Sequence, residues 1–270
     1  MGIINGTDFN DNNTVNNGKL RPSLVGTNKG DSIYGKRGND ILSGLDGNDN
    51  LYGGHHEDIL YGGYGNDLVA GELGYDTLYG QQGNDILHGG YNNDILYGGS
   101  GDDVLVGWGG MGDEYDTLTG NGGADRFVLG NQLLGVFYKL DDQSNTDYYA
   151  TITDFKKKDG DKVQVVGNQS NYELEKDINL VGGSAKDTLI YFKYNSGARN
   201  LIGVLPDTTN ISFSDFTFKS WGWGFSNWKG SNAQDSGAFY NGDLIGIVQE
   251  VNLTNVNSNQ MFIWAPPILG

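Results

Sequence analysis

Apolar and polar positions repeat with a period of nine residues through the first half of the chain. Each unit has six residues rich in Gly, Asn and Asp, followed by one large apolar residue between two variable positions. The six-residue segment suits a tight turn, because Gly, and less readily Asn or Asp, can adopt left-handed conformations. The remaining three residues suit a very short strand whose central side chain points to one face. We therefore predict a solenoid in which two units form one 18-residue coil and alternate units stack on the same side. The apolar residues are Ile33, Leu42, Leu51, Leu60, Val69, Leu78, Leu87, Leu96, Leu105, Leu118 and Phe127.

An aspartate lies two positions before each of these apolar residues. A glycine lies five positions before each aspartate except at Met111, and a four-residue insertion around Trp108–Met111 precedes the last two units. Stacking of alternate units predicts two columns of aspartates. One column contains Asp31, Asp49, Asp67, Asp85, Asp103 and Asp125, and the other contains Asp40, Asp58, Asp76, Asp94 and Asp116.

Stacked carboxylates need a cation. Neighbours in a column would lie roughly 4.8 Å apart, the spacing of hydrogen-bonded strands. Two unit charges at that distance repel by about 3.5 kcal/mol at an effective dielectric constant of 20. A hard divalent ion between the turns removes this repulsion, and carboxylate and carbonyl oxygens suit Ca²⁺ better than Mg²⁺. All eleven aspartates are therefore candidate ligands of several Ca²⁺ ions.

The written-out units resemble a known family. GGYGNDLVA (62–70) and GGSGDDVLV (98–106) follow the pattern G-G-x-G-x-D-x-U-x, where U is a large apolar residue. The segment 26–128 thus resembles the RTX (repeats-in-toxin) calcium-binding repeats. The resemblance implies an all-β fold built on a parallel β-roll, with calcium between successive turns held by the aspartates and by turn carbonyls. It also implies a secreted or cell-surface protein exported in one step by the type I route.

The two columns differ in the residue two positions before each aspartate. This residue is always Gly in the first column from Asp49 onward, whereas the second column has His56, Asn92 and Glu114 at three of its five turns. A residue with a side chain adopts the left-handed conformation less readily than Gly does. We predict that calcium fills the first column before the second.

The regions outside the repeat are expected to cap it. Residues 1–25 form an N-terminal segment in which Gly6–Asp11 resembles a degenerate turn, with Asp11 as a candidate extra ligand. Residues 129–270 are predicted to be a β-rich C-terminal region for capping, assembly or export. Within it we expect a turn and strand over 151–167, a hairpin of 187–194 with 200–206, and a further strand near 212–218. The pieces Ile152–Phe155 and Gly160–Val163 resemble the tail that follows many RTX arrays.

Composition and charge exclude several classes of protein. The chain has 34 acidic and 17 basic side chains and a net charge of −17, so it presents no basic face for nucleic acid. It has neither a run of 18 apolar residues nor a Sec-type signal peptide, and it contains no cysteine. Residues 1–128 hold 30 of the 45 glycines, which marks a change of composition near Gly130.

We find no catalytic motif in the sequence. Neither HExxH nor GxSxG occurs, and periodicity explains the paired carboxylates, so we expect the protein not to be an enzyme. The favoured function is a structural calcium-binding protein of the cell surface or extracellular matrix. The initiator Met1 and a chain made almost entirely of roll and tail favour this interpretation. The alternatives are a folding and export module of a larger secreted enzyme, or a carbohydrate-binding adhesin with a surface glycan as its partner.

Two further features concern partners. Positions beside the buried apolar residues would form ladders on the outside of each sheet, and these ladders suit a homo-oligomer or polymer such as a filament or layer. An aromatic cluster near the C-terminus is consistent with a core, an interface or a sugar platform. The outward residues are Ile41, Ser43, Ile59, Tyr61, Thr77, Tyr79, Ile95 and Tyr97 on one sheet, and Leu68, Ala70, Ile86, His88, Val104 and Val106 on the other. The aromatic cluster comprises Trp221, Trp223, Phe225, Trp228, Phe239, Tyr240, Phe262 and Trp264.

Overall fold

A computed structural model of the chain divides into two compact units, Met1–Ser220 and Trp221–Gly270. The structure describes residues 2–12, 14–16, 19–109, 114–131, 135–136, 148–178, 186–193, 199–206, 208, 210–219, 235–240 and 243–249. The aromatic cluster lies outside the described residues, apart from the backbone of Phe239 and Tyr240.

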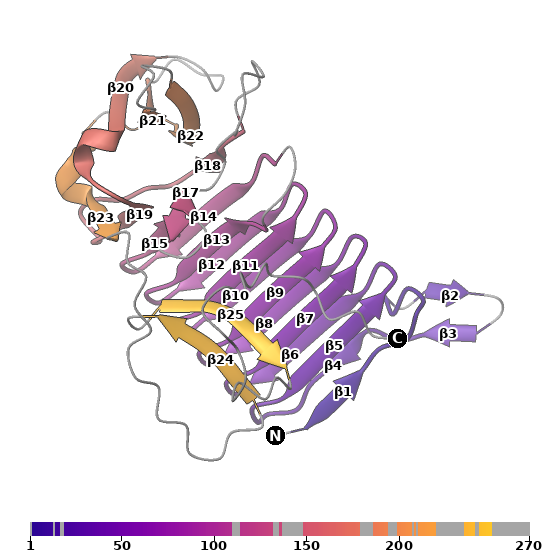
Figure 1. Ribbon diagram of the computed structural model, residues 1–270. Helices are drawn as coiled ribbons and strands as arrows, with labels where there is room; N and C mark the ends of the chain where they lie inside the picture. The colour runs from indigo at the N-terminus through magenta and orange to yellow at the C-terminus, as the bar shows by residue number, and fades with distance from the viewer. Residues whose placement is uncertain are drawn as a thin grey trace, which may run out of the picture. The chain divides into compact units, whose positions relative to one another are not determined.

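Two long sheets run through the first unit, and successive strands alternate between them (Figure 1). In spatial order the first sheet contains β1 (Ile3–Asn5), β5 (Ser32–Arg37), β7 (Asn50–His55), β9 (Leu68–Leu73), β11 (Ile86–Tyr91), β13 (Val104–Trp108), β15 (Arg126–Val128), β19 (Lys162–Val166) and β23 (Phe216–Lys219). The second sheet contains β20 (Tyr172–Ile178), β21 (Asp187–Lys193), β22 (Arg199–Leu205), β18 (Ala150–Ile152), β14 (Thr117–Gly122), β12 (Ile95–Ser100), β10 (Thr77–Gln82), β8 (Ile59–Tyr64), β6 (Ile41–Asp46) and β4 (Leu24–Val25). The predicted parallel β-roll is thereby confirmed.

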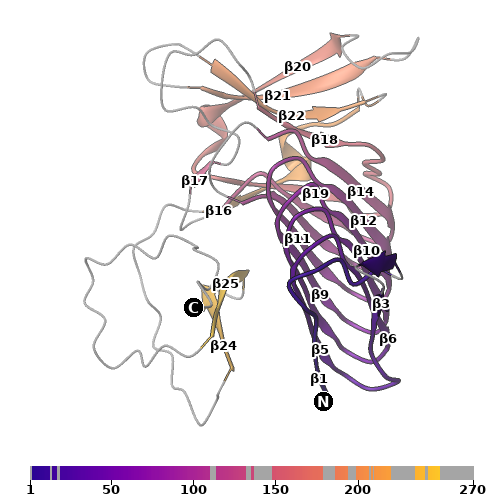
Figure 2. The same ribbon diagram turned by 90° about the vertical axis from the view of Figure 1, so that its right-hand side faces the viewer.

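The register shows the predicted 18-residue coil. Leu51 pairs with Val69 in the first sheet and Leu60 pairs with Leu78 in the second, and all strand pairs from β4 to β15 are parallel. The four-residue insertion shifts one coil, so that Leu105 pairs with Phe127. Viewed after a quarter turn, the coils follow one another as nested loops (Figure 2).

The core is a ladder of apolar side chains between the two sheets. All eleven repeat residues from Ile33 to Phe127 are fully buried, and the ladder continues into Val163 and Ile152. Burial of one such side chain contributes about 1.5–3 kcal/mol, and each coil adds two. A coil therefore buries its apolar residues only against neighbouring coils, which is the reason that the array folds as a stack.

The strands are longer than the three residues that we expected. Most span six residues, because the turn glycines continue the ladder of backbone hydrogen bonds before the chain reverses. Each coil edge needs two left-handed residues, four and two positions before the aspartate. At the first of these places Gly63 has φ 121° whereas Leu45 has φ 80°, so that position also tolerates residues with side chains.

Both sheets extend beyond residues 26–128. β1 and β4 precede the repeat, and β18, β19, β22 and β23 continue the parallel stack after it. The predicted hairpin is present as the antiparallel pair β21 and β22, with β20 beside β21. The turn and strand predicted over 151–167 correspond to the turns of 153–160 and to β19, while β18 was not predicted, and the strand near 212–218 corresponds to β23.

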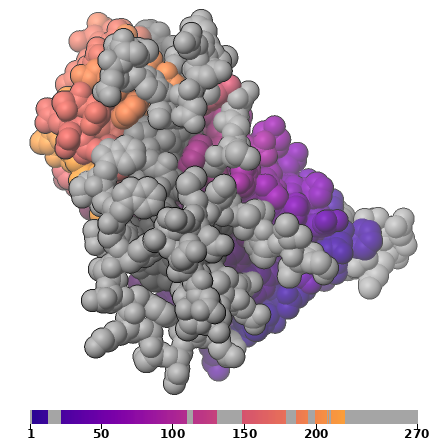
Figure 3. Space-filling view, viewed as in Figure 1, coloured from indigo at the N-terminus to yellow at the C-terminus, as the bar shows by residue number. Residues whose placement is uncertain are grey.

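The smaller sheets are two-stranded and antiparallel. They pair β2 (Thr14–Asn16) with β3 (Lys19–Arg21), β16 (Gly130–Asn131) with β17 (Gly135–Val136), and, in the second unit, β24 (Asp235–Tyr240) with β25 (Asp243–Gln249). In the part of the chain that the structure describes, no helix is long and apolar enough to cross a membrane. In the space-filling view the visible part of the roll is coloured indigo and purple (Figure 3).

Candidate metal sites

The strand register places the eleven repeat aspartates in two columns, one at each edge of the roll. Each aspartate lies in a turn, directly before a strand. Although turns are usually exposed, each of these side chains is at most 3% exposed. Asp11 begins the second column, because its carbonyl accepts the amide of Ile41 as Asp40 accepts that of Ile59. Asp161 extends the first column beyond Asp125. The sequence predicts Asp11 as an extra ligand, whereas for Asp161 its only signal is the resemblance of Gly160–Val163 to the tail of RTX arrays.

One oxygen of each interior aspartate holds neighbouring coils together. The backbone amide of Asp49 donates to Oδ1 of Asp67 at 2.8 Å, and that of Asp58 donates to Oδ1 of Asp76 at 2.8 Å. The same bond recurs between every pair of successive aspartates in both columns, at 2.5 to 3.0 Å. A charged acceptor makes these bonds stronger than neutral ones.

The second oxygen is buried without a protein partner at eight of these aspartates. A carboxylate oxygen that has lost water and gained no donor destabilises the folded chain. The eight oxygens are Oδ2 of Asp40, Asp49, Asp58, Asp67, Asp76, Asp85, Asp94 and Asp103. They form two rows of four that face the gaps between turns.

The glycine five positions before each of these eight aspartates leaves space beside that oxygen. A Cβ at Gly44 would lie 2.3 Å from Oδ2 of Asp49 and 2.4 Å from the carbonyl oxygen of Gly62 on the next coil. A Cβ at Gly80 would lie 2.4 Å from Oδ2 of Asp85 and 2.5 Å from the carbonyl oxygen of Gly98. Any side chain there would therefore occupy the space between a carboxylate oxygen and a carbonyl oxygen.

These oxygens fit calcium. Ca²⁺ accepts mixed carboxylate and carbonyl ligands at about 2.3–2.6 Å in flexible geometry. Among the residues that the structure describes, no three Asp, Glu or His side chains converge as a metal cluster, so turn carbonyls must supply part of any coordination shell.

Burial raises the pKa values of the interior aspartates. It raises that of Asp67 and of Asp103 to about 7 and that of Asp85 to about 6, while hydrogen bonds from the preceding aspartate amides oppose the shift. In the second column it raises the pKa of Asp58 to about 9 and that of Asp94 well above its usual range. Neighbouring carboxylates add to both shifts, so the second column is the less favourable place for uncompensated charge.

The second column also holds two additional acidic residues. Burial raises the pKa of Glu72 to about 7 and that of Glu114 to about 8, and Asp116 contributes to the latter shift. His56 and Asn92 adopt left-handed conformations with φ of 83° and 78°, as their turn positions require. This column thus combines strained turns with a higher density of carboxylates.

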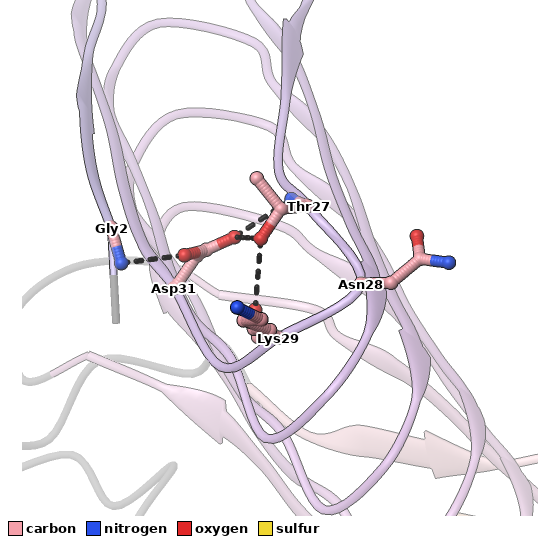
Figure 4. A pocket seen from close by; sticks show the side chains of 5 residues that line it. All are labelled: Gly2, Thr27, Asn28, Lys29 and Asp31. Carbon is pink, nitrogen blue, oxygen red and sulfur yellow. Dashed lines mark hydrogen bonds between the residues drawn. The ribbon is translucent and has the colours of Figure 1, made fainter.

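The N-terminal turns have different chemistry. Oδ2 of Asp31 accepts the amide and the hydroxyl of Thr27, both at 2.7 Å, and Oδ1 accepts the amide of Gly2 at 2.6 Å (Figure 4). These hydrogen bonds, that of the Thr27 hydroxyl above all, lower the pKa of Asp31. Asp11 repeats the arrangement with the amide and hydroxyl of Thr7, at 2.6 and 3.0 Å. Asp31, a candidate ligand from its spacing, therefore differs from the eight interior residues.

Comparison with known proteins identifies the repeat. A family model described as the RTX calcium-binding nonapeptide repeat matches four copies, at residues 25–54, 57–78, 79–110 and 112–132. This part of the chain therefore consists of RTX calcium-binding nonapeptide repeats. No curated protein gave a significant match. Among solved structures, the chain is similar to the AlgE6R3 subunit of the Azotobacter vinelandii mannuronan C5-epimerase, at 21% identity and a TM-score of 0.37. That match covers 68% of this chain and 92% of the other.

Proposed function

We propose that this protein is a secreted structural component of a cell surface or extracellular matrix that folds when it binds calcium. The main support for this function is the set of eight buried Oδ2 atoms that have no protein partner. Bound calcium would neutralise these carboxylates and crosslink successive turns. The interior aspartates of both columns supply the carboxylate ligands, and the turn carbonyls complete the coordination.

Calcium would couple export to folding. A chain whose folded form needs bound ions stays unfolded where calcium is scarce, because binding free energy is then part of folding free energy. RTX repeats are typical of secreted proteins, and type I export of an unfolded chain fits this coupling.

Circular dichroism with and without calcium tests the proposal. In chelator at pH 8 residues 26–128 should lack the β signal, and the signal should appear on titration with calcium. Magnesium at the same concentration serves as the control ion, since it retains water and prefers octahedral geometry. An unchanged β spectrum in chelator would contradict the proposal.

We infer further that the calcium-loaded roll assembles with copies of itself. On the second sheet Tyr61, Tyr79 and Tyr97 stack with ring centroids 5.0 Å apart, beside a row that includes Ile59 and Ile95. These residues are partly exposed, and Ile95 is 39% exposed. The first sheet is less open than expected, since Ala70 is 4% exposed. The second-sheet ladder is a flat apolar strip that a second copy could cover.

Light scattering tests this assembly. Scattering should rise with calcium in the native protein and fall in Ile59→Lys/Tyr61→Glu, because desolvating a charge at an apolar contact is unfavourable. Tyr64→Glu/Gln82→Lys places the same two charges on exposed positions of the same roll, away from the second-sheet ladder, and serves as the control. A native protein that stays monomeric at saturating calcium and high concentration would overturn the assembly.

A further inference from the structure

A lysine ammonium group lies beside the last gap of the first aspartate column. This gap lies between Asp125 and Asp161, whose coils are joined by the bond from the Asp125 amide to Oδ1 of Asp161 at 3.0 Å. The ammonium group of Lys156 donates to the carbonyl oxygen of Asn121, in the turn that leads to Asp125. It also pairs with Oδ2 of Asp154 at 3.2 Å.

The path of the chain after β18 brings Lys156 to this place. The amide of Thr153 donates to the carbonyl of Leu118 at 2.9 Å. The chain therefore stays paired with the coil of β14 for one residue beyond the end of β18. Asp154 then stands where interior coils have glycine, opposite Gly120. Its two carboxylate oxygens accept the amides of Gly120 and Asn121, each at 2.8 Å. The carboxylate of Asp154 thus accepts hydrogen bonds from two N–H groups of the turn at Gly120 and Asn121, while Lys156 donates to a carbonyl of the same turn.

Lys156 also acts electrostatically on the two aspartates of this gap. Burial raises the pKa of Asp125 to about 6 and also raises the pKa of Asp161, and in both cases Lys156 opposes the shift while Asp154 adds to it. The backbone amide of Lys156 binds Oδ2 of Asp161 at 2.7 Å, so this oxygen has the donor that the eight interior oxygens lack. One lysine residue therefore provides both a positive charge and an N–H donor to this gap.

We infer that Lys156 replaces calcium at the C-terminal end of the first column and thereby limits how far the row of ions extends. The inference rests on the proposed calcium function. The ammonium group binds one turn carbonyl oxygen, of Asn121, and one carboxylate oxygen, of Asp154, which are the two kinds of oxygen that line the interior gaps. Thr27 closes the other end of this column with its own donors. Calcium binding is thus confined to the gaps between the two ends.

Counting bound calcium in the full-length protein tests the inference. Lys156→Met removes the ammonium group and keeps the backbone amide, and Lys158→Met removes the same charge from an exposed position two residues away. After dialysis against saturating calcium, Lys156→Met should hold one more ion per chain than the native protein and Lys158→Met should hold the native number. Asp154→Asn/Lys156→Met should return to the native number, since a carboxylate ligand of the new site is lost.

The outcomes separate the inference from the proposed function. If the native protein binds no calcium, the proposed function fails and the inference fails with it. If the native protein binds calcium and folded Lys156→Met has the same number of ions, only the inference is overturned. The inference requires that calcium can take the place of the missing ammonium group. A Lys156→Met protein that does not fold at any calcium concentration therefore also overturns the inference.

Discussion

At the scale of the residue, an aspartate's role depends on what binds its second oxygen. Asp67 and Asp31 belong to the same column and have the same spacing from glycine and from an apolar residue. Oδ2 of Asp67 is buried without a protein partner, whereas Oδ2 of Asp31 accepts two hydrogen bonds from Thr27. A periodic sequence thus contains sites of different chemistry.

This difference predicts opposite responses to substitution. Asp67→Asn should lose about one bound calcium ion and destabilise the calcium-loaded protein by about 1–3 kcal/mol, the range for a buried polar group that loses its partner. Asp31→Asn should retain the native number of ions. Calcium counting and thermal unfolding in saturating calcium measure both effects, and equal ion loss in the two variants would argue against the distinction.

At the scale of the element, the two coil edges are built with unequal turns. His56 and Asn92 adopt left-handed conformations in the second column, where the first column has Gly65 and Gly83. Left-handed backbone is unfavourable by roughly 1–2 kcal/mol for a residue with a side chain. At this position the turns of His56 and Asn92 therefore start from a less favourable conformation than the first-column turns before any ion binds.

We predict that removing this strain tightens calcium binding. His56→Gly/Asn92→Gly should lower the calcium concentration at the midpoint of folding about threefold to tenfold, since 1.4 kcal/mol corresponds to a factor of ten in an equilibrium constant. Gln82→Gly/Ser100→Gly alters exposed positions near the first-column turns and should leave the midpoint unchanged or higher. Equal calcium affinity in the native and His56→Gly/Asn92→Gly proteins would show that strain does not govern the order of filling.

At the scale of the whole molecule, the roll is a stack of coils with a row of buried acids along each edge. The folded-state pKa values of Asp67, Asp76 and Asp103 are raised to about 7 and that of Asp58 to about 9, mainly by burial. Without calcium the folded chain therefore binds more protons than the unfolded chain between about pH 4 and pH 9. Stability of the metal-free roll should accordingly fall as pH rises through this range and be greatest near pH 4.

Acid should therefore partly substitute for calcium. In protein freed of calcium, the β signal in circular dichroism should be stronger at pH 4.5 than at pH 8. With calcium present the dependence should reverse, because protons compete for the same carboxylates and calcium affinity rises with pH. A metal-free spectrum that does not change between pH 4.5 and pH 8 would contradict this prediction.

The nine-residue period was sufficient to predict the roll, the two aspartate columns and the apolar ladder from Ile33 to Phe127. This was possible because each coil repeats the same local problem, and pairing 18 residues apart follows from the period alone. The strands exceed three residues because hydrogen bonding to neighbouring coils continues through the turn glycines, which no single unit specifies. The closure of the ends could not be predicted either. Gly2, Asp154 and Lys156 act through contacts that span 29 to 35 residues. Periodicity determines the interior of a stacked array, and only tertiary structure decides where the array stops.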